Sequence, residues 1–222
     1  MAQAQSKPNW FVIGISAAVV VVLVALGLVV VWMNNRATDA GPAPSSSKSF
    51  DAETGAIAFG DGDDVVDVFV DFQCPVCKSF EEQFGAQLMK AADDDKITLN
   101  YHPIAILDRY SQGTEYSSRS ASAAVCVAES DPDEYLDFAQ LLFDNQPEEN
   151  TTGLETSKLA ELAEQAGADE AASCITDETY KKFGVAQAKK HEIAATPTVD
   201  LNGTRLNLQD QADLQKLVKL IS

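Results

Sequence analysis

The sequence is poor in basic side chains, in histidine and in cysteine. Its 222 residues include 16 lysines and arginines against 34 aspartates and glutamates, which gives a formal net charge of −18. A strongly anionic domain repels phosphates, so this composition argues against a nucleic-acid partner. A structural zinc site usually takes four ligands from paired Cys-x-x-Cys or His motifs. Here Cys126 and Cys174 are isolated, and His102 and His191 lack ligand spacing, so we expect no metal.

The sequence has a single long apolar run, at residues 10–33. The run carries no charge, Ser16 is its only conventional polar side chain, and Trp10 and Trp32 lie near its ends. About 20 apolar residues suffice to cross a bilayer, and indoles favour the membrane interface. The apolar region of a cleaved signal peptide is shorter, roughly 7 to 15 residues, and small residues follow it. We therefore predict an uncleaved transmembrane signal anchor rather than a cleaved signal peptide.

The anchor divides the chain into four parts. Residues 1–9 form a short tail, and residues 10–33 cross the membrane. Residues 34–49 are rich in proline, glycine, alanine and serine, which is typical of a flexible linker. Residues 50–222 form one folded domain. Charges on the two sides of the anchor are nearly balanced, so the positive-inside rule does not set its orientation.

The folded domain is expected to have an α/β fold. Val65–Phe72 is β-branched and aromatic, which favours a central strand. A helix at 75–91 and a strand at 97–106 complete a right-handed βαβ unit. The other expected elements, in chain order, are a helical insertion at about 111–192, a hairpin of strands 198–201 and 205–208 around Asn202-Gly203, and a helix at 210–221.

The closest cysteine pair lies where the first strand ends and its helix begins. Cys74 and Cys77 enclose only Pro75 and Val76, and proline suits the first turn of a helix. The free amides and the dipole at a helix N-terminus stabilise a thiolate, whose pKa falls from roughly 8.5 to about 3.5–7.5. This position favours thiol–disulfide exchange. An inert structural disulfide is the alternative, although so short a loop removes little entropy from the unfolded chain.

Two motifs together resemble a known family. The stretch VFVDFQCPVC, the helical insertion and the late stretch ATPTVDLNG are similar to DsbA-like thiol–disulfide oxidoreductases of the thioredoxin fold, in particular the membrane-anchored Gram-positive and actinobacterial type. The resemblance covers nearly all of residues 50–222. It implies that Cys74 and Cys77 are catalytic. It also implies that Pro197 is cis beside them, and that the backbone of Thr196 binds an extended substrate.

The sequence departs from the family pattern at two positions. Val76 stands where well-known members carry histidine, and Val68 stands where relatives carry a buried acid. The first change leaves the oxidising strength of the pair open. Asp71, three residues before Cys74, matches the anchored branch better. We expect it either to lie near the motif and act as a proton relay or to be a surface carboxylate at the strand end.

Cys126 and Cys174 both lie in the insertion. Either could be a small buried hydrophobe, but an even cysteine count in an oxidising compartment favours a disulfide. The resemblance supports this pairing, and the closed loop would contribute roughly 4 kcal/mol in the chain-entropy model. A redox site with a second disulfide belongs outside the cytoplasm. We therefore expect a cytoplasmic N-terminus and a single-pass membrane protein with an extracytoplasmic domain.

The expected function is disulfide formation in secreted or envelope proteins. The alternatives are a disulfide isomerase or reductase of the same fold and a non-enzymatic, membrane-anchored binding module. The redox-active disulfide would be the only electron carrier, with no added cofactor. The resemblance implies reduced secreted proteins as substrates and a membrane quinone-linked reoxidant of the DsbB or vitamin K epoxide reductase type. A monomer is expected, and His102 is expected to be structural rather than catalytic.

Overall fold

The computed structural model describes residues 22–29 and 41–221. Residues 22–29 are helical and exposed, and they fall in a separate unit, Met1–Asp39, from the folded unit Ala40–Ser222. No helix within the described ranges is both long and apolar enough to cross a membrane. The expected tail at 1–9, most of the expected anchor at 10–33 and the start of the linker lie outside the described residues.

A six-stranded mixed sheet forms the centre of the folded unit, in the order β1-β2-β4-β3-β5-β6. Its only parallel pair among the described strands is β3 with β4. Val66, Val68 and Val70 of β3 are buried, as expected of a central strand. The strands are β1 Phe50–Asp51, β2 Ala56–Phe59, β3 Asp64–Val70, β4 Ile97–Pro103, β5 Thr198–Leu201 and β6 Thr204–Arg205.

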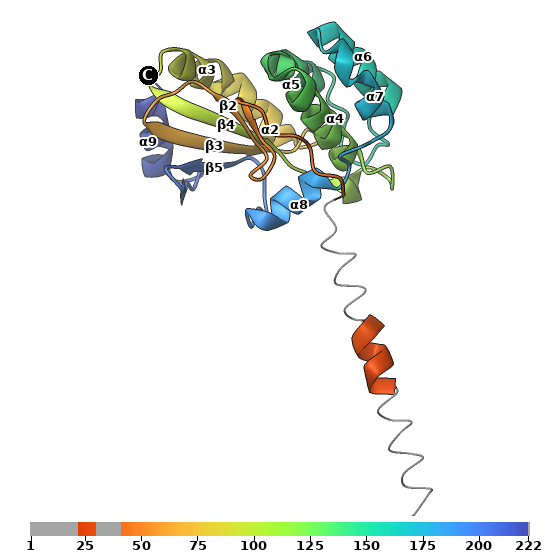
Figure 1. Cartoon of the computed structure of the whole chain (residues 1–222). Helices are drawn as coiled ribbons and strands as arrows, with labels where there is room; N and C mark the ends of the chain where they lie inside the picture. Colours follow the sequence, from red (N-terminus) through yellow and green to blue (C-terminus); the bar gives the residue numbers. More distant parts are fainter. Residues whose placement is uncertain (1–21, 30–40, 222) are drawn as a thin grey trace, which may run out of the picture. The chain divides into compact units, whose positions relative to one another are not determined.

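One interrupted helix connects β3 to β4 and completes the βαβ unit. It consists of α2 Pro75–Phe80, a π-helical turn η1 Glu81–Gly85 and α3 Ala86–Asp93. Figure 1 shows α3 on one side of the sheet and α8 on the other. The main core lies on the α3 side, whereas a small cluster of Phe69, Ile104, Ala188 and Ile193 lies under α8.

The helical insertion lies between β4 and β5, as the sequence indicates. Its central helix α4 is buried over almost its whole length, because serine and alanine let neighbouring helices approach closely. Cys126 of α4 and Cys174 of α7 form a disulfide with a Cα–Cα distance of 5.8 Å. Figure 1 shows α4 to α7 gathered at one side of the sheet. The elements are η2 Asp108–Tyr110, α4 Tyr116–Ser130, η3 Pro132–Glu134, α5 Tyr135–Asp144, α6 Thr156–Ala166, η4 Asp169–Ala171, α7 Ala172–Thr176 and α8 Phe183–Lys190.

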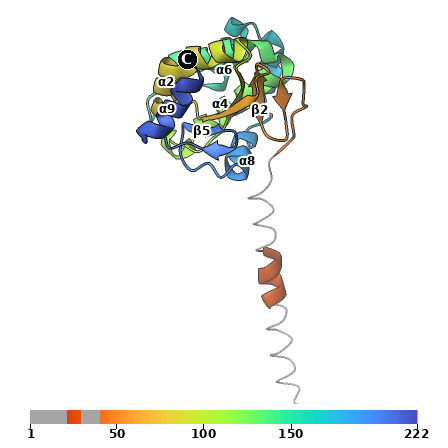
Figure 2. The same cartoon turned by 90° about the vertical axis from the view of Figure 1, so that its left-hand side faces the viewer.

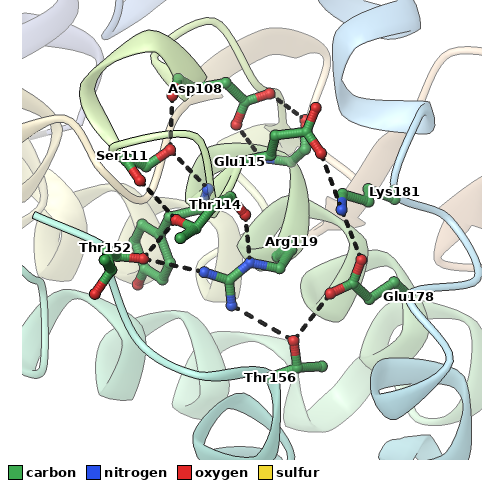
Figure 3. Close-up of polar contacts among 11 residues, drawn as sticks. Asp108, Ser111, Thr114, Glu115, Arg119, Thr152, Thr156, Glu178 and Lys181 are labelled. Atoms are coloured by element: carbon green, nitrogen blue, oxygen red, sulfur yellow. Dashed lines mark hydrogen bonds and ion pairs between the residues drawn. The ribbon is translucent and has the colours of Figure 1, made fainter.

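The buried guanidinium of Arg119 fixes the two loops that enter α4 and α6 (Figure 3). It donates to the carbonyl oxygens of Thr114 at 2.8 Å, Leu154 at 2.6 Å and Thr152 at 3.2 Å. A fixed planar fork of donors suits such a set of converging carbonyls. Polar contacts therefore stabilise the insertion in addition to its disulfide.

The last helix, α9 Gln211–Leu220, follows the hairpin (Figure 2). Its Leu217 is fully buried in the core. Its start is set by Asp210, whose side chain accepts hydrogen bonds from the backbone amides of Ala212 and Asp213. A capping carboxylate of this kind satisfies amides that have no partner within the helix. The turn at Asn202-Gly203, the strand over 198–201 and this helix match the sequence prediction, whereas the second strand, expected over 205–208, is only Thr204–Arg205.

Other elements differ from the sequence prediction. The strands β1 and β2, at one end of the sheet, were not expected, because they are too short to show an alternating pattern. The helical insertion is interrupted before α8: Glu178 has a positive φ of 49°, residues 177–182 form turns, and α8 begins at Phe183. The strand expected over 97–106 ends at Pro103, because its partner β3 ends at Val70, whose carbonyl oxygen accepts the amide of Ile104.

Candidate functional site

Cys74 occupies the N-cap of α2, where the chain leaves β3 and begins its helix. Its backbone is extended, with φ −79° and ψ 115°, and Pro75 takes the first helical position. The carbonyl oxygen of Cys74 accepts the amides of Cys77 at 3.1 Å and Lys78 at 3.3 Å. The motif therefore forms the N-cap and the first turn of α2, which places the Cys77 thiol close to that of Cys74.

The two thiols have opposite electrostatic environments. A hydrogen bond from the Cys77 thiol is the largest influence lowering the pKa of Cys74, which falls to about 6, and burial opposes it. Contacts with Thr196 and with the amides of Cys77 and Val76 lower the Cys74 pKa further. Burial raises the pKa of Cys77 well above the ordinary thiol value. Cys74 is 6% exposed and Cys77 is fully buried, so the thiolate forms on the sulfur that is nearer to solvent.

The loop before β5 supplies the other wall of the site. The Thr196–Pro197 peptide bond is cis, as the resemblance implies. The Cys74 thiol donates a hydrogen bond to the carbonyl oxygen of Thr196 at 3.4 Å. Pairing of Thr198 with Phe69 in the sheet holds this loop beside the end of β3.

Asp71 is fully buried behind the motif. Its carboxylate accepts the backbone amides of Gln73 at 3.0 Å, Ile106 at 2.9 Å and Leu107 at 3.1 Å. Burial outweighs these bonds and raises the pKa of Asp71 to about 6. Its carbonyl oxygen also accepts the amide of Cys74 at 2.9 Å. The alternative of a surface carboxylate at the strand end is therefore wrong, and Asp71 lies next to the motif.

The two positions that depart from the family pattern are both apolar, but they differ in solvent exposure. Val76 is 59% exposed at the rim of the motif, and Val68 is fully buried in the sheet. Neither side chain offers a hydrogen bond to a thiolate. The stabilisation of the Cys74 thiolate therefore comes from Cys77, Thr196 and backbone amides.

Sequence reasoning missed two glutamines that hold the motif in place. The side-chain amide of Gln146 donates to the carbonyl oxygens of Phe72 at 2.9 Å and Cys74 at 3.0 Å. Gln73 donates to the carbonyl oxygen of Tyr110 at 2.9 Å and accepts the Ser117 hydroxyl at 3.1 Å. Gln146 is distant in sequence, and no local pattern marks it.

Neither histidine belongs to this site. His102 is buried in β4, where its ring lies 2.9 Å from the Asp67 carboxylate and stacks on Phe69. His191 contacts the carbonyl oxygen of Thr54 at 2.9 Å. Within the described part of the chain, no group of three or more His, Cys, Asp or Glu side chains could hold a metal ion.

The comparison with known proteins agrees with this geometry. The family model described as Thioredoxin matches residues 55–220. The oxidised crystal structure of DsbA from Mycobacterium tuberculosis superposes with a TM-score of 0.66 at 32% identity, over 75% of this chain and 93% of that one. The reduced disulfide bond oxidoreductase DsbG from the same organism gives 0.64 at 32% identity, over 82% and 90%.

Two further relatives extend the comparison. The thiol–disulfide oxidoreductase MdbA from Corynebacterium diphtheriae has a TM-score of 0.65 at 25% identity, over 84% of this chain and 99% of that one. Among curated proteins, the serine/threonine-protein kinase PknE of M. tuberculosis is 33% identical over 167 residues. That match includes 69% of this chain but spans only 29% of the kinase.

Proposed function

We propose that this chain, which belongs to the thioredoxin family and has the fold of DsbA-like thiol–disulfide oxidoreductases, introduces disulfide bonds into secreted or envelope proteins. The proposal rests on the difference between the pKa values of the Cys74 and Cys77 thiols. The pKa of the first thiol is lowered to about 6, whereas that of the second is raised by burial. A reduced form stabilised as a thiolate makes the corresponding disulfide a stronger oxidant.

The reaction begins with the oxidised Cys74–Cys77 pair. A substrate thiolate attacks the sulfur of Cys74, the more exposed of the two. A mixed disulfide forms as the Cys74–Cys77 bond breaks, and Cys77 leaves with the electron pair. A second substrate thiolate then attacks the substrate sulfur of the mixed disulfide and releases Cys74 as a thiolate. Two electrons pass to the protein, and the substrate gains one disulfide.

Asp71 serves as the proton relay for the buried sulfur in this proposal. Because burial raises the pKa of Cys77, its thiolate takes up a proton as it leaves. The backbone amide of Asp71 stabilises that sulfur, and the carboxyl group of the same residue titrates near pH 6. A group with this pKa can deliver and recover protons near neutral pH.

The cis loop binds the substrate chain. The Thr196 carbonyl faces Cys74 at 3.4 Å, so an extended peptide can pair with this loop while its cysteine reaches the sulfur. The pair itself carries the electrons, so no added cofactor is required. A membrane quinone-linked partner of the DsbB or vitamin K epoxide reductase type would take the two electrons and restore the disulfide. An N-terminal anchor would hold the domain outside the cytoplasm.

Oxidative refolding of a reduced model protein tests this function. We expect the oxidised full-length chain to restore the activity of the model protein, and Cys74→Ser to abolish that effect. Cys77→Ser should accumulate mixed disulfides whose partners identify the substrates. Full activity of Cys74→Ser would overturn the mechanism. No refolding activity in the wild-type protein would leave the binding-module alternative.

Equilibration with glutathione separates an oxidase from a reductase. We expect the Cys74–Cys77 disulfide to be reduced more readily than that of thioredoxin, whose potential is about −270 mV. A potential as negative as that of thioredoxin would favour the reductase alternative.

A further inference from the structure

A cavity lies where the active-site helix, β4 and α5 meet. It has a volume of about 390 Å³ and is lined by η1, α3, β4 and α5. Its polar lining consists of acidic side chains, tyrosines and the amide of Gln140, and no lysine, arginine or histidine of the described chain contributes to it. The side chains that characterise it are Glu81, Glu82, Asp137, Tyr101, Tyr135 and Phe143.

Two polar atoms of this cavity have no partner among the described residues. Glu81 accepts the Tyr101 hydroxyl on Oε2 at 2.9 Å, but its buried Oε1 accepts nothing. The hydroxyl of Tyr135 is also buried and unpartnered, and Tyr135 as a whole is fully buried. Buried polar groups are nearly always hydrogen-bonded, so an unpartnered pair in one cavity points to a missing partner.

The chemistry of that missing partner follows from the lining. Glu81 presents an acceptor oxygen, the Tyr135 hydroxyl oxygen can accept as well, and carboxylates without basic neighbours favour a positive charge. Aromatic faces add cation–π attraction. A primary ammonium group has three donors and a positive charge, whereas a quaternary ammonium has no donor for these oxygens.

The backbone around Glu81 presents its carboxyl group to this cavity. The π-helical turn η1 shifts the register of the active-site helix at this residue. A Cβ atom at Gly85 would come within 2.6 Å of Glu81 Oε2, so the glycine leaves the space that the carboxyl group occupies. Burial raises the pKa of Glu81 to about 7, and a bound cation would offset that burial.

We propose that this cavity binds a primary ammonium group on an aliphatic chain, with Glu81 as its counter-charge and Tyr135 as a second acceptor. The ammonium can belong to a free alkylamine or to the lysine side chain of a polypeptide. The binding does not depend on the state of Cys74 and Cys77. Glu81 follows Cys77 by one helical turn in sequence, so an occupied cavity would lie close to the redox site.

Calorimetric titration of the full-length chain with n-butylamine and cadaverine tests the proposal. We expect saturable one-site binding of both amines and none of n-butanol, which has a similar shape but no charge. Glu81→Gln keeps the size of the side chain, and we expect it to weaken binding by about tenfold or more, as a charge-assisted hydrogen bond is lost. Tyr135→Phe should weaken binding to a smaller extent. Glu148→Gln, an exposed glutamate outside the cavity, is the matched control and should bind as the wild type does.

The pH dependence gives a second readout. Alkylamines stay charged below about pH 10, so the affinity should rise as Glu81 loses its proton around pH 7 and then level off. The other groups that face Glu81 are Tyr101 from β4, Tyr135 and Asp137 from α5, and Glu82 from its own turn. A rise near pH 7 that disappears in Glu81→Gln assigns binding to Glu81 rather than to the exposed Glu82 or Asp137.

A third arm distinguishes the two sources of the ammonium. The titrant is a capped Gly-Lys-Gly peptide, with Gly-Ala-Gly as its control. Binding of the lysine peptide supports a polypeptide ligand, and binding of the free amines alone supports a small metabolite. Failure of every amine to bind saturably, or equal binding by Glu81→Gln, would overturn the proposal. Neither result would bear on the thiol chemistry, which is measured separately by refolding.

Discussion

Gln146 donates a hydrogen bond of 3.0 Å from its side-chain amide to the carbonyl oxygen of Cys74. The same amide donates to the carbonyl oxygen of Phe72 at 2.9 Å. Gln146 belongs to the helical insertion, and the two carbonyls flank the residue that leads into the active-site helix. The insertion therefore fixes the turn on which the amides of Val76 and Cys77 are aimed at the Cys74 thiolate.

Replacing Gln146 by alanine should loosen this turn. We expect the Cys74 pKa to rise, because the amides of Val76 and Cys77 would be less well aimed at the sulfur. The unfolding free energy should fall by about 1 to 2 kcal/mol for the two lost hydrogen bonds. Thiolate absorbance measured against pH gives the first quantity, and urea unfolding gives the second. Gln209→Ala, at an exposed position, is the control. An unchanged Cys74 titration in Gln146→Ala would leave Gln146 with a structural role only.

Alkylation of the reduced protein should report the Cys74 thiolate. The thiolate fraction increases with pH, so the rate with iodoacetamide should rise through pH 6 and level off above it. Peptide mapping should place the modification on Cys74, since Cys77 is buried and protonated. Modification of Cys77 at a comparable rate would contradict this division.

A matched pair of variants identifies the source of the low Cys74 pKa. The hydrogen bond from Cys77 is its largest cause, so Cys77→Ala should move the alkylation midpoint to a higher pH. Cys77→Ser keeps a hydroxyl donor and should move the midpoint less. Equal midpoints in the two variants would mean that the backbone amides and Thr196 account for the shift.

Much of this site could be predicted from local patterns. The β-branched run before Cys74, Asn202-Gly203 between two short strands and the spacing of the last helix all act within a few residues, and the structure has each of them. The even number of cysteines, together with the family resemblance, predicts the disulfide between Cys126 and Cys174. The resemblance, rather than the residues themselves, gave the cis bond before Pro197.

The remainder depends on contacts between distant segments. The burial of Asp71 is set by the loop at Ile106 and Leu107, which no pattern near Asp71 reveals. Gln146 looks like an ordinary polar loop residue until the insertion folds back on the motif.

Asp71→Asn tests the proton relay. An amide cannot deliver a proton, so oxidation of a substrate thiol should be slower than in the wild type, by up to roughly a hundredfold. The Asp71 carboxyl holds its proton below about pH 6 and loses it above. The ratio of the wild-type rate to the Asp71→Asn rate should therefore be largest below pH 6 and decline as pH rises through this value. Stopped-flow kinetics give the two oxidation rates between pH 4 and 8, with the same low-pKa substrate thiol used at every pH. A ratio that does not change with pH would refute the relay.

Removing the second disulfide should lower stability without changing the redox site. Cys126 and Cys174 are separated by 48 residues, and closing such a loop contributes roughly 4 kcal/mol in the chain-entropy model. We expect the double variant Cys126→Ala/Cys174→Ala to lose about that amount in urea unfolding. Its Cys74 alkylation profile should match that of the wild type. A changed profile would show that the disulfide also influences the active site.

Arg119 should be the most sensitive polar position in the insertion. Its guanidinium donates to the carbonyl oxygens of Thr114 and Thr152 (Figure 3) and to that of Leu154, and the residue is only 7% exposed. Each buried carbonyl left without a donor costs about 1 to 3 kcal/mol, so Arg119→Met should lower the unfolding free energy by at least about 3 kcal/mol. Arg119→Lys keeps the charge but loses the planar fork, and we expect it to recover only part of the loss.

Hydrogen exchange locates the effect of Arg119. In Arg119→Met, the amides of the loops at 111–115 and 151–156 should exchange faster than in the wild type, while the strand β3 remains protected. Arg109→Met, at an exposed position, changes the same side chain without removing buried contacts and should leave both stability and exchange nearly unchanged. Equal destabilisation by the two variants would mean that the charge of the arginine, and not its three buried hydrogen bonds, stabilises the insertion.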